Sequence, residues 1–407
     1  MRHLTCARTI GRAVVLLAAM LASARASQAQ VCADAVQAVV PFVYDEPRIY
    51  VPVSAAGGAL GLFILDTGTG DSLIDTAVAA RTGARTVGEA VLRGAGRGEL
   101  DVDESGPVTL LIGQTPLRLE TVHVGALDAR LRPTVGRQIG GLIGAQFFRE
   151  HVVSVDFARR LLELRDPRTF VYAGAGVRLP FHLADGAPIV TGSITLADGT
   201  RLPLRLLVDL GAQADLLLAG PFVSAHPELA RRSPQVVEPL DAGVGGETRY
   251  AFTRLTGLNI GPLSAGELIA GLSVNGSLRG GYYDGLLGAA FLQRYRVTFD
   301  YARREIILEP NLLAEPDRFD RSGAFVVQEL NDAHRFTIHW VAAGTPAADA
   351  GLAVGDVVRR VGALSADKLT LNDIRRALSA EDDAPVTIIV ERGGRMIELA
   401  VRPRALL

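Results

Sequence analysis

The hexapeptide Phe-Ile-Leu-Asp-Thr-Gly at residues 63–68 returns 143 positions later as Leu-Leu-Val-Asp-Leu-Gly at residues 206–211. Two further blocks repeat in the same order, each at an offset of 144. They are residues 141–148 with 285–292, and residues 153–160 with 297–304. Three blocks in one order and at nearly one spacing indicate an internal duplication, so the chain contains two copies of one folding unit.

Each copy is expected to be mainly β. Residues 63–65 and 206–208 are short apolar runs that end in a glycine-containing turn, as buried strands do. Residues 153–157 and 297–301 alternate between apolar and polar side chains, and each is followed by an Ala-Arg-Arg turn and another apolar run. This pattern predicts a β-hairpin at the end of each copy.

The first 29 residues have the layout of a secretory signal peptide. A basic start with Arg2, Arg8 and Arg12 precedes an apolar run over residues 13–22, and small residues then predict cleavage after Ala29. The apolar run is too short to cross about 30 Å of hydrocarbon. No later stretch reaches 18 residues without a charge. We therefore expect a periplasmic or secreted protein that is not an integral membrane protein after the signal is removed.

Size and charge narrow the class of protein. A chain of 407 residues with 48% hydrophobic residues has room for roughly two to four domains. Its formal net charge of −2 argues against nucleic-acid binding, which favours a strongly basic surface.

A third, unrelated domain is predicted after the repeat. Residues 311–321 are polar and broken by proline, which is typical of a linker. Beyond them, two strand-like runs enclose a helix-like stretch at residues 370–378, so we expect an α+β domain. The predicted organisation is a signal peptide at 1–29, a first lobe at 30–170, a second lobe at 171–310, a linker at 311–321 and the third domain at 322–404.

Asp66 and Asp209 occupy the same position in the two copies, each at the end of an apolar run. A carboxylate placed there costs free energy unless a partner or a reaction uses it. If the copies pack about a two-fold axis, the two carboxyls meet, and one of them keeps its proton to higher pH. The ionised member can then take a proton from water while the protonated member polarises a peptide carbonyl. Gly68 and Gly211 would let the two loops approach closely.

The repeated Asp-x-Gly loop, with an apolar-apolar-glycine block about 75 residues later, resembles the aspartic proteases of the retropepsin and pepsin type. The resemblance covers about residues 45–310. It implies a bilobal, acid-protease-like pair of β-barrels in which polypeptide substrates are hydrolysed. The residues that it assigns are Asp66 and Asp209 as the catalytic dyad, and Thr67, Gly68 and Gly211 as the residues that brace the two loops.

Two further features follow from this resemblance. The glycine-rich residues 94–98 and 243–246 would form flap-like hairpins over the substrate, with Gly96 and Gly245 as flap candidates. Leu210 departs from the family, which usually has threonine or serine there. Because leucine has no hydroxyl, the bracing would be one-sided, through Thr67.

Competing chemistries have no motif in this sequence. It contains no His-Glu-x-x-His, no Gly-x-Ser-x-Gly and no phosphate-binding Gly-x-x-x-x-Gly-Lys. We therefore expect neither a metal site nor a cofactor.

The third domain carries a second resemblance. Residues 344–352 read Gly-Thr-Pro-Ala-Ala-Asp-Ala-Gly-Leu and residues 354–358 read Val-Gly-Asp-Val-Val, which is similar to bacterial PDZ domains. That resemblance implies binding of extended peptides, including the C-termini of peptides or proteins, by strand addition to a sheet edge. The candidates for the loop that receives a terminal carboxylate are Gly323, Ala324 and Phe325, with residues 335–338 as the alternative. A packing or dimerisation module is the other interpretation of this domain.

Taken together, these patterns predict an exported aspartic endopeptidase whose PDZ-like domain recruits protein substrates. Leu210 favours an alternative, a non-catalytic periplasmic peptide-binding or scaffold protein that keeps the protease fold. A homodimer that pairs Asp66 across two chains is the third hypothesis.

Overall fold

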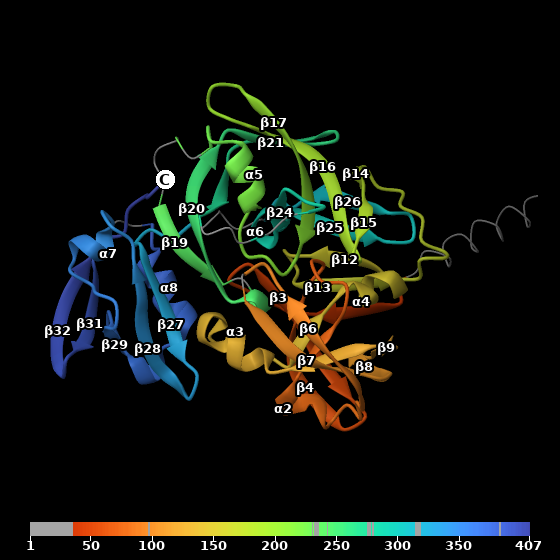
Figure 1. The fold of residues 1–407 in the computed structure, drawn as a ribbon, viewed down its shortest axis with the longest axis horizontal. Helices are drawn as coiled ribbons and strands as arrows, with labels where there is room; N and C mark the ends of the chain where they lie inside the picture. The colour runs from red at the N-terminus through yellow and green to blue at the C-terminus, as the bar shows by residue number, and fades with distance from the viewer. Residues whose placement is uncertain are drawn as a thin grey trace, which may run out of the picture.

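The computed structural model describes residues 36–407, apart from residues 97, 230, 232–235, 242, 275–277, 279–280, 314–318 and 382–383. The predicted signal peptide lies outside the described residues. Figure 1 shows three parts that are mainly β: a first lobe, a second lobe, and a C-terminal domain that lies beside both.

The first lobe is built on a ten-stranded sheet. Its strands are β2 (Val43–Asp45), β3 (Arg48–Ala55), β4 (Gly58–Leu65), β5 (Leu73–Asp75), β6 (Thr86–Arg93), β7 (Glu99–Ser105), β8 (Val108–Ile112), β9 (Thr115–Leu119), β10 (Val122–Gly125) and β11 (Gly141–Ile143). They lie in the order β6-β7-β10-β5-β11-β4-β3-β8-β9, with β2 paired to β3. The helices of this lobe are α2 (Thr76–Ala79), α3 (Leu127–Val135) and α4 (Ala145–Glu150).

The second lobe repeats this sheet strand for strand. Its strands are β15 (His182–Ala184), β16 (Ala187–Thr195), β17 (Arg201–Asp209), β18 (Leu216–Leu218), β19 (Val236–Asp241), β20 (Glu247–Leu255), β21 (Gly257–Ile260), β22 (Leu263–Ala265), β23 (Leu268–Ser273) and β24 (Gly285–Gly288). The order is β19-β20-β23-β18-β24-β17-β16-β21-β22, with β15 paired to β16. The short helices are α5 (Gly220–Ala225), η1 (Gly243–Gly245) and α6 (Ala289–Leu292). The duplication read from the sequence is thus a duplication of topology.

A six-stranded sheet joins the two lobes. Its strands are β1 (Ala38–Pro41), β12 (Val152–Asp156), β13 (Leu161–Arg165), β14 (Val177–Pro180), β25 (Tyr295–Asp300) and β26 (Glu305–Pro310). The hairpins β12–β13 and β25–β26 are the two predicted from the sequence, and β12 pairs antiparallel with β25. Ser154 lies opposite Thr298, its equivalent in the other copy, with 2.8 Å between the hydroxyl oxygens. The two copies therefore meet at equivalent residues, as a two-fold relation requires.

The lobes were expected to be β-barrels, and this detail is wrong. The mainly β, bilobal architecture is confirmed, but the strand order of each ten-stranded sheet has two separate ends, which are β6 and β9 in the first lobe and β19 and β22 in the second. The sheets are therefore open, because the edge strands do not pair with each other.

The two lobes also share one hydrophobic core. Buried side chains from both copies form a continuous cluster that runs through the joining sheet. Phe148 of the first lobe belongs to this cluster, with its ring centroid 5.2 Å from that of Phe299 and 5.7 Å from that of Tyr301. Such edge and stacked contacts add to the free energy of apolar burial. We therefore expect the two lobes to unfold together.

The C-terminal domain is a separate α+β unit with its own core. Its elements are β27 (Ala324–Glu329), β28 (Asp332–Val341), α7 (Pro346–Asp349), β29 (Val357–Val361), β30 (Leu364–Ser365), η2 (Ala366–Lys368), α8 (Leu371–Leu378), β31 (Val386–Arg392) and β32 (Arg395–Val401). The helix predicted at residues 370–378 is α8, which Thr370 caps by accepting from the Asp373 amide. Strand β27 lies at the edge of the sheet order β27-β28-β29-β31-β32.

Within the part of the chain that the structure describes, no helix is both long and apolar enough to span a bilayer.

Shortening Phe148 tests the shared core. Phe148→Ala should lower the free energy of unfolding of the two lobes by about 3–5 kcal/mol, through lost burial and the cavity left behind. Urea denaturation followed by circular dichroism measures this, and the two lobes should still unfold in one transition. The control, Val171→Ala, changes a side chain that is 61% exposed and should leave the midpoint nearly unchanged. Two separate lobe transitions would contradict the shared core.

Candidate active site

The loops that carry Asp66 and Asp209 are positioned by a buried strand threaded beside each of them. Strand β11 lies parallel to β4 and antiparallel to β5, and the Asp66 amide donates to the Ile143 carbonyl at 2.9 Å. Strand β24 takes the same place between β17 and β18 in the second lobe. These strands are the apolar-apolar-glycine blocks of the repeat. Because their side chains are buried in the core, they hold both loops at fixed positions.

The structure brings Asp66 and Asp209 together. Each carboxyl packs on the glycine of the opposite loop: a Cβ on Gly68 would lie 2.6 Å from Asp209 Cγ, and a Cβ on Gly211 would lie 2.7 Å from Asp66 Cγ. The two carboxyls also hydrogen-bond to each other. A methyl group at either glycine would force the loops apart, so glycine is required at both positions.

Amide groups of the two loops hold the carboxyls in place. The Gly68 amide donates to Asp66 Oδ1 at 2.7 Å, and the Gly211 amide donates to Asp209 Oδ1 at 2.7 Å. Asp209 Oδ1 also accepts from the Ala212 amide at 3.2 Å. These contacts fix the orientation of both side chains before any ligand arrives.

The surroundings raise the pKa of both carboxyls. Burial raises the pKa of Asp209 well above its ordinary value, and the negative charge of Asp66 raises it further. Burial also raises the pKa of Asp66, but the Gly68 amide and the hydrogen bond from Asp209 lower it. The pair therefore keeps one shared proton to higher pH than an isolated aspartate would.

Thr67 braces the two loops from the first lobe. Its hydroxyl donates to the Val208 carbonyl at 2.8 Å and accepts from the Leu210 amide at 2.9 Å. Leu210, in the equivalent position, is fully buried among apolar side chains. The bracing is therefore one-sided, with one hydroxyl making both hydrogen bonds across the interface.

The two predicted flaps meet at their tips. They are the hairpins β6–β7 and β19–β20, and the Gly98 amide donates to the Gly245 carbonyl at 2.9 Å. Gly96 and Gly245 pack backbone against backbone, since a Cβ on Gly245 would lie 2.4 Å from the Gly96 nitrogen. Gly96 and Gly245, the two flap candidates, therefore contact each other.

Each flap tip packs against the opposite lobe, and sequence reasoning did not predict this. Ala95, in the first flap, packs against the apolar cluster of the second lobe that includes Tyr250 and Leu286. Val244, in the second flap, packs against the equivalent cluster of the first lobe, which includes Leu142. Apolar contacts with the opposite lobe therefore hold each flap tip closed.

The PDZ-candidate residues lie away from the dyad, at the start of β27. Gly323 has a φ of +77° and its carbonyl accepts from the Ala342 amide at 2.8 Å. Ala324 and Phe325 line a cavity between the C-terminal domain and the lobes. The Arg375 guanidinium lies 5.4 Å from the centre of the Phe325 ring.

The C-terminal domain contacts the second flap directly, which no sequence pattern predicted. Trp340 donates from Nε1 to the Val237 carbonyl at 3.0 Å, and the Arg249 guanidinium lies 4.5 Å above its ring. His339 Nε2 lies 2.6 Å from Glu247 Oε2. Trp340 is the chain's one tryptophan, and its place on a predicted strand was the available signal.

Among the residues that the structure describes, no three histidine, cysteine, aspartate or glutamate side chains converge closely enough to hold an ion.

Comparison with known proteins gives one family and one distant fold. A family model described as PDZ domain matches residues 337–392, so the C-terminal domain is a PDZ domain. No curated protein matches the chain. Among solved structures, the chain is similar to the aspartic proteinase from Irpex lacteus at 14% identity, with a TM-score of 0.44, over 69% of this chain and 99% of that chain. At that distance the likeness identifies no activity.

Removing the Thr67 hydroxyl tests the one-sided brace. Thr67→Val should lower the free energy of unfolding by about 1–3 kcal/mol, because the buried Leu210 amide loses its acceptor. Thr67→Ser keeps the hydroxyl and is the matched control, with a smaller loss. Equal losses in both variants, measured by urea denaturation, would show that the hydroxyl contributes nothing.

The dyad should also make stability depend on pH. A carboxyl whose folded pKa is raised stabilises the fold below its unfolded pKa, 3.8 for aspartate, and loses this contribution as the pH rises through the folded value. The asparagine side chain in Asp209→Asn does not titrate in this pH range. Its free energy of unfolding, measured by urea denaturation from about pH 3 to pH 8, should therefore rise relative to that of the natural protein as pH increases. A difference that is constant with pH would contradict the shared proton.

Proposed function

We propose that the protein is an aspartic endopeptidase that hydrolyses peptide bonds with the Asp66–Asp209 dyad and an activated water. The observation that carries this proposal is the reciprocal packing of each carboxyl on the opposite loop's glycine, with one proton held between the two. Two carboxyls with different protonation states at one point supply a general base and a general acid together.

The reaction can be written from these two groups. Asp66 takes a proton from water as the water oxygen attacks the peptide carbonyl carbon, and Asp209 gives its proton to the carbonyl oxygen. The resulting diol has four single bonds at carbon. Asp66 then gives its proton to the amide nitrogen, Asp209 takes one from a hydroxyl, and the C–N bond breaks. Both carboxyls thereby return to their starting states.

The flaps suit an extended polypeptide substrate. Their tips close against each other between two equivalent apolar clusters, one in each lobe. An entering chain would displace Ala95 and Val244 from those clusters and offer apolar side chains in their place. The flaps would then exclude bulk water from the dyad, which strengthens electrostatic interactions there. We propose unfolded or loosely folded polypeptides as the substrate class.

The PDZ domain would recruit these polypeptides, since the family binds extended peptides at a sheet edge. We place this activity in the periplasm or outside the cell, because of the signal-like residues 1–29.

Replacing either dyad residue tests the activity. Asp66→Asn and Asp209→Asn should each lower kcat for cleavage of an unfolded protein by at least about a hundredfold, since each removes one proton-transfer group. Asp156→Asn is the matched control, because Asp156 accepts from the Arg159 amide in a hairpin turn outside the dyad. Unchanged cleavage in both dyad variants would refute the assignment, and a statine-type inhibitor provides an independent check.

The second candidate is a non-catalytic peptide-binding protein. Leu210 favours it, because the missing hydroxyl leaves the bracing of the loops one-sided. Leu210→Thr separates the two candidates: an active natural protein with little change supports the protease, whereas activity that appears only in the variant supports the binding protein.

A further inference from the structure

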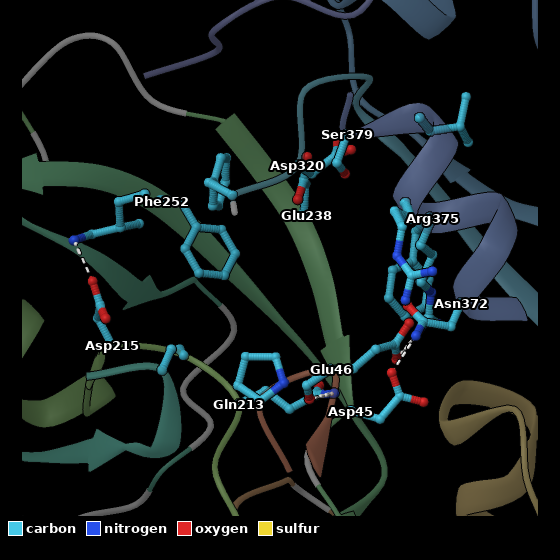
Figure 2. Close-up of a pocket in the computed structure, with 18 of the residues that line it drawn as sticks. Asp45, Glu46, Gln213, Asp215, Glu238, Phe252, Asp320, Asn372, Arg375 and Ser379 are labelled. Atoms are coloured by element: carbon cyan, nitrogen blue, oxygen red, sulfur yellow. Dashed lines mark hydrogen bonds and ion pairs between the residues drawn. The ribbon is translucent and has the colours of Figure 1, made fainter. Parts of the chain in front are cut away.

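A cavity of about 360 Å³ lies between the PDZ domain and the two lobes. Its walls include Ala324 and Phe325 of β27 and Asn372 and Leu378 of α8, so it is continuous with the groove between the edge strand and the helix. The opposite wall includes Glu238, which belongs to β19 of the second flap. Figure 2 shows Glu238 and Asp320 close together on one side of this cavity, with Arg375 and Glu46 on another.

The loop expected to receive a terminal carboxylate uses its amides internally. The Ser322 amide donates to Asp320 Oδ1 at 3.0 Å, and the Gly323 amide donates to Asp320 Oδ2 at 2.5 Å. The Ala324 amide donates to the Ser322 hydroxyl at 3.1 Å. The chain's own carboxylate therefore occupies the position in which a ligand carboxylate would be bound.

A second carboxyl lies beside the first. Glu238 hydrogen-bonds to Asp320, and its pKa is raised well above the ordinary value, first by burial and then by the negative charge of Asp320. A ligand carboxylate entering here would meet two acids. A cation would instead neutralise the pair and allow Glu238 to ionise.

Glu238 and Glu46 each bring a buried acceptor oxygen to the lining of this cavity. Among the described residues, Glu238 Oε1 and Glu46 Oε1 are buried without a hydrogen-bond partner. Buried acceptors left unpaired are unfavourable, and a ligand rich in N–H donors satisfies them.

The acidic side chains of this cavity differ in their partners. The cavity is lined by five acidic side chains and three arginines. Asp45 is paired with Arg137, Glu46 with Arg375 and Asp215 with Arg294. Glu238 and Asp320 instead hydrogen-bond to each other, so theirs are the carboxyls that a positive ligand would meet.

We propose that this cavity binds an extended polypeptide through a lysine or arginine side chain that contacts Glu238 and Asp320, rather than through a free C-terminus. This inference rests on the proposed function, because it names the substrate segment that the PDZ domain recruits. The peptide backbone would add to the edge of β27, in place of the Arg375 guanidinium that donates to the Val326 carbonyl at 2.9 Å. The basic side chain would reach across the groove to β19. The ligand would thus touch the strand that leads to the second flap tip.

Peptide binding to the full-length chain tests this proposal. The chain carries Asp66→Asn, so that the peptides stay intact, and binding is followed by fluorescence anisotropy. Three labelled peptides of one apolar sequence are compared: one with a central lysine and an amidated end, one with norleucine in its place and an amidated end, and the norleucine peptide with a free C-terminus.

The lysine peptide should bind at least about tenfold more tightly than either norleucine peptide, the ratio expected for one charge-assisted hydrogen bond. Glu238→Gln should abolish this preference, and Glu46→Gln provides a second acidic position in the same cavity that should weaken it. Glu267→Gln is the control, because Glu267 is exposed in the second lobe outside the cavity and should leave the preference intact. Circular dichroism confirms that each variant is folded.

Three results would overturn the proposal: tighter binding of the free C-terminus, equal binding of all three peptides, or a lysine preference that survives in Glu238→Gln. The assay is independent of cleavage. Lysine-selective binding by a protein that cleaves nothing would refute the protease while supporting this site, and cleavage without lysine selectivity would do the reverse.

Discussion

The reciprocal contact between the two Asp-x-Gly loops is the constraint on which the rest of the structure depends. Asp66 packs on Gly211 and Asp209 packs on Gly68, at distances that exclude even one added methyl group. Such an approach requires the two copies to meet about a two-fold axis. The joining sheet, with Ser154 opposite Thr298, and the shared aromatic core provide that arrangement at the other end of the interface. Loop contact, sheet and core are therefore parts of one symmetric junction.

The chemistry, in contrast, depends on departures from symmetry. The two aspartates are equivalent by sequence, yet they share one proton, so one carboxyl is ionised while the other is not. The brace is also unequal, because Thr67 makes both cross-lobe hydrogen bonds while Leu210 packs in the core. A duplicated fold thus presents two chemically distinct carboxyls, which is what a split acid and base require.

The PDZ domain is joined to the same machinery. Trp340 bonds to β19, Arg375 pairs with Glu46 of the first lobe, and Glu238 of β19 forms one wall of the proposed peptide site. Strand β19 therefore contacts the PDZ groove and also forms part of the second flap hairpin. Recognition of a basic segment and closure of the flap over the dyad would be carried by a single strand.

The sequence by itself determined the local features. The repeat located both aspartates, the apolar runs predicted the strands that end at them, and the helical spacing of apolar residues predicted α8, because each depends only on neighbouring residues. Only the tertiary structure decided that the sheets stay open and that Ala95 and Val244 each pack against the opposite lobe. It also decided that the Asp320 carboxylate accepts hydrogen bonds from the loop amides. Those outcomes depend on which distant segments meet and on the burial and charge found there, and no local pattern encodes them.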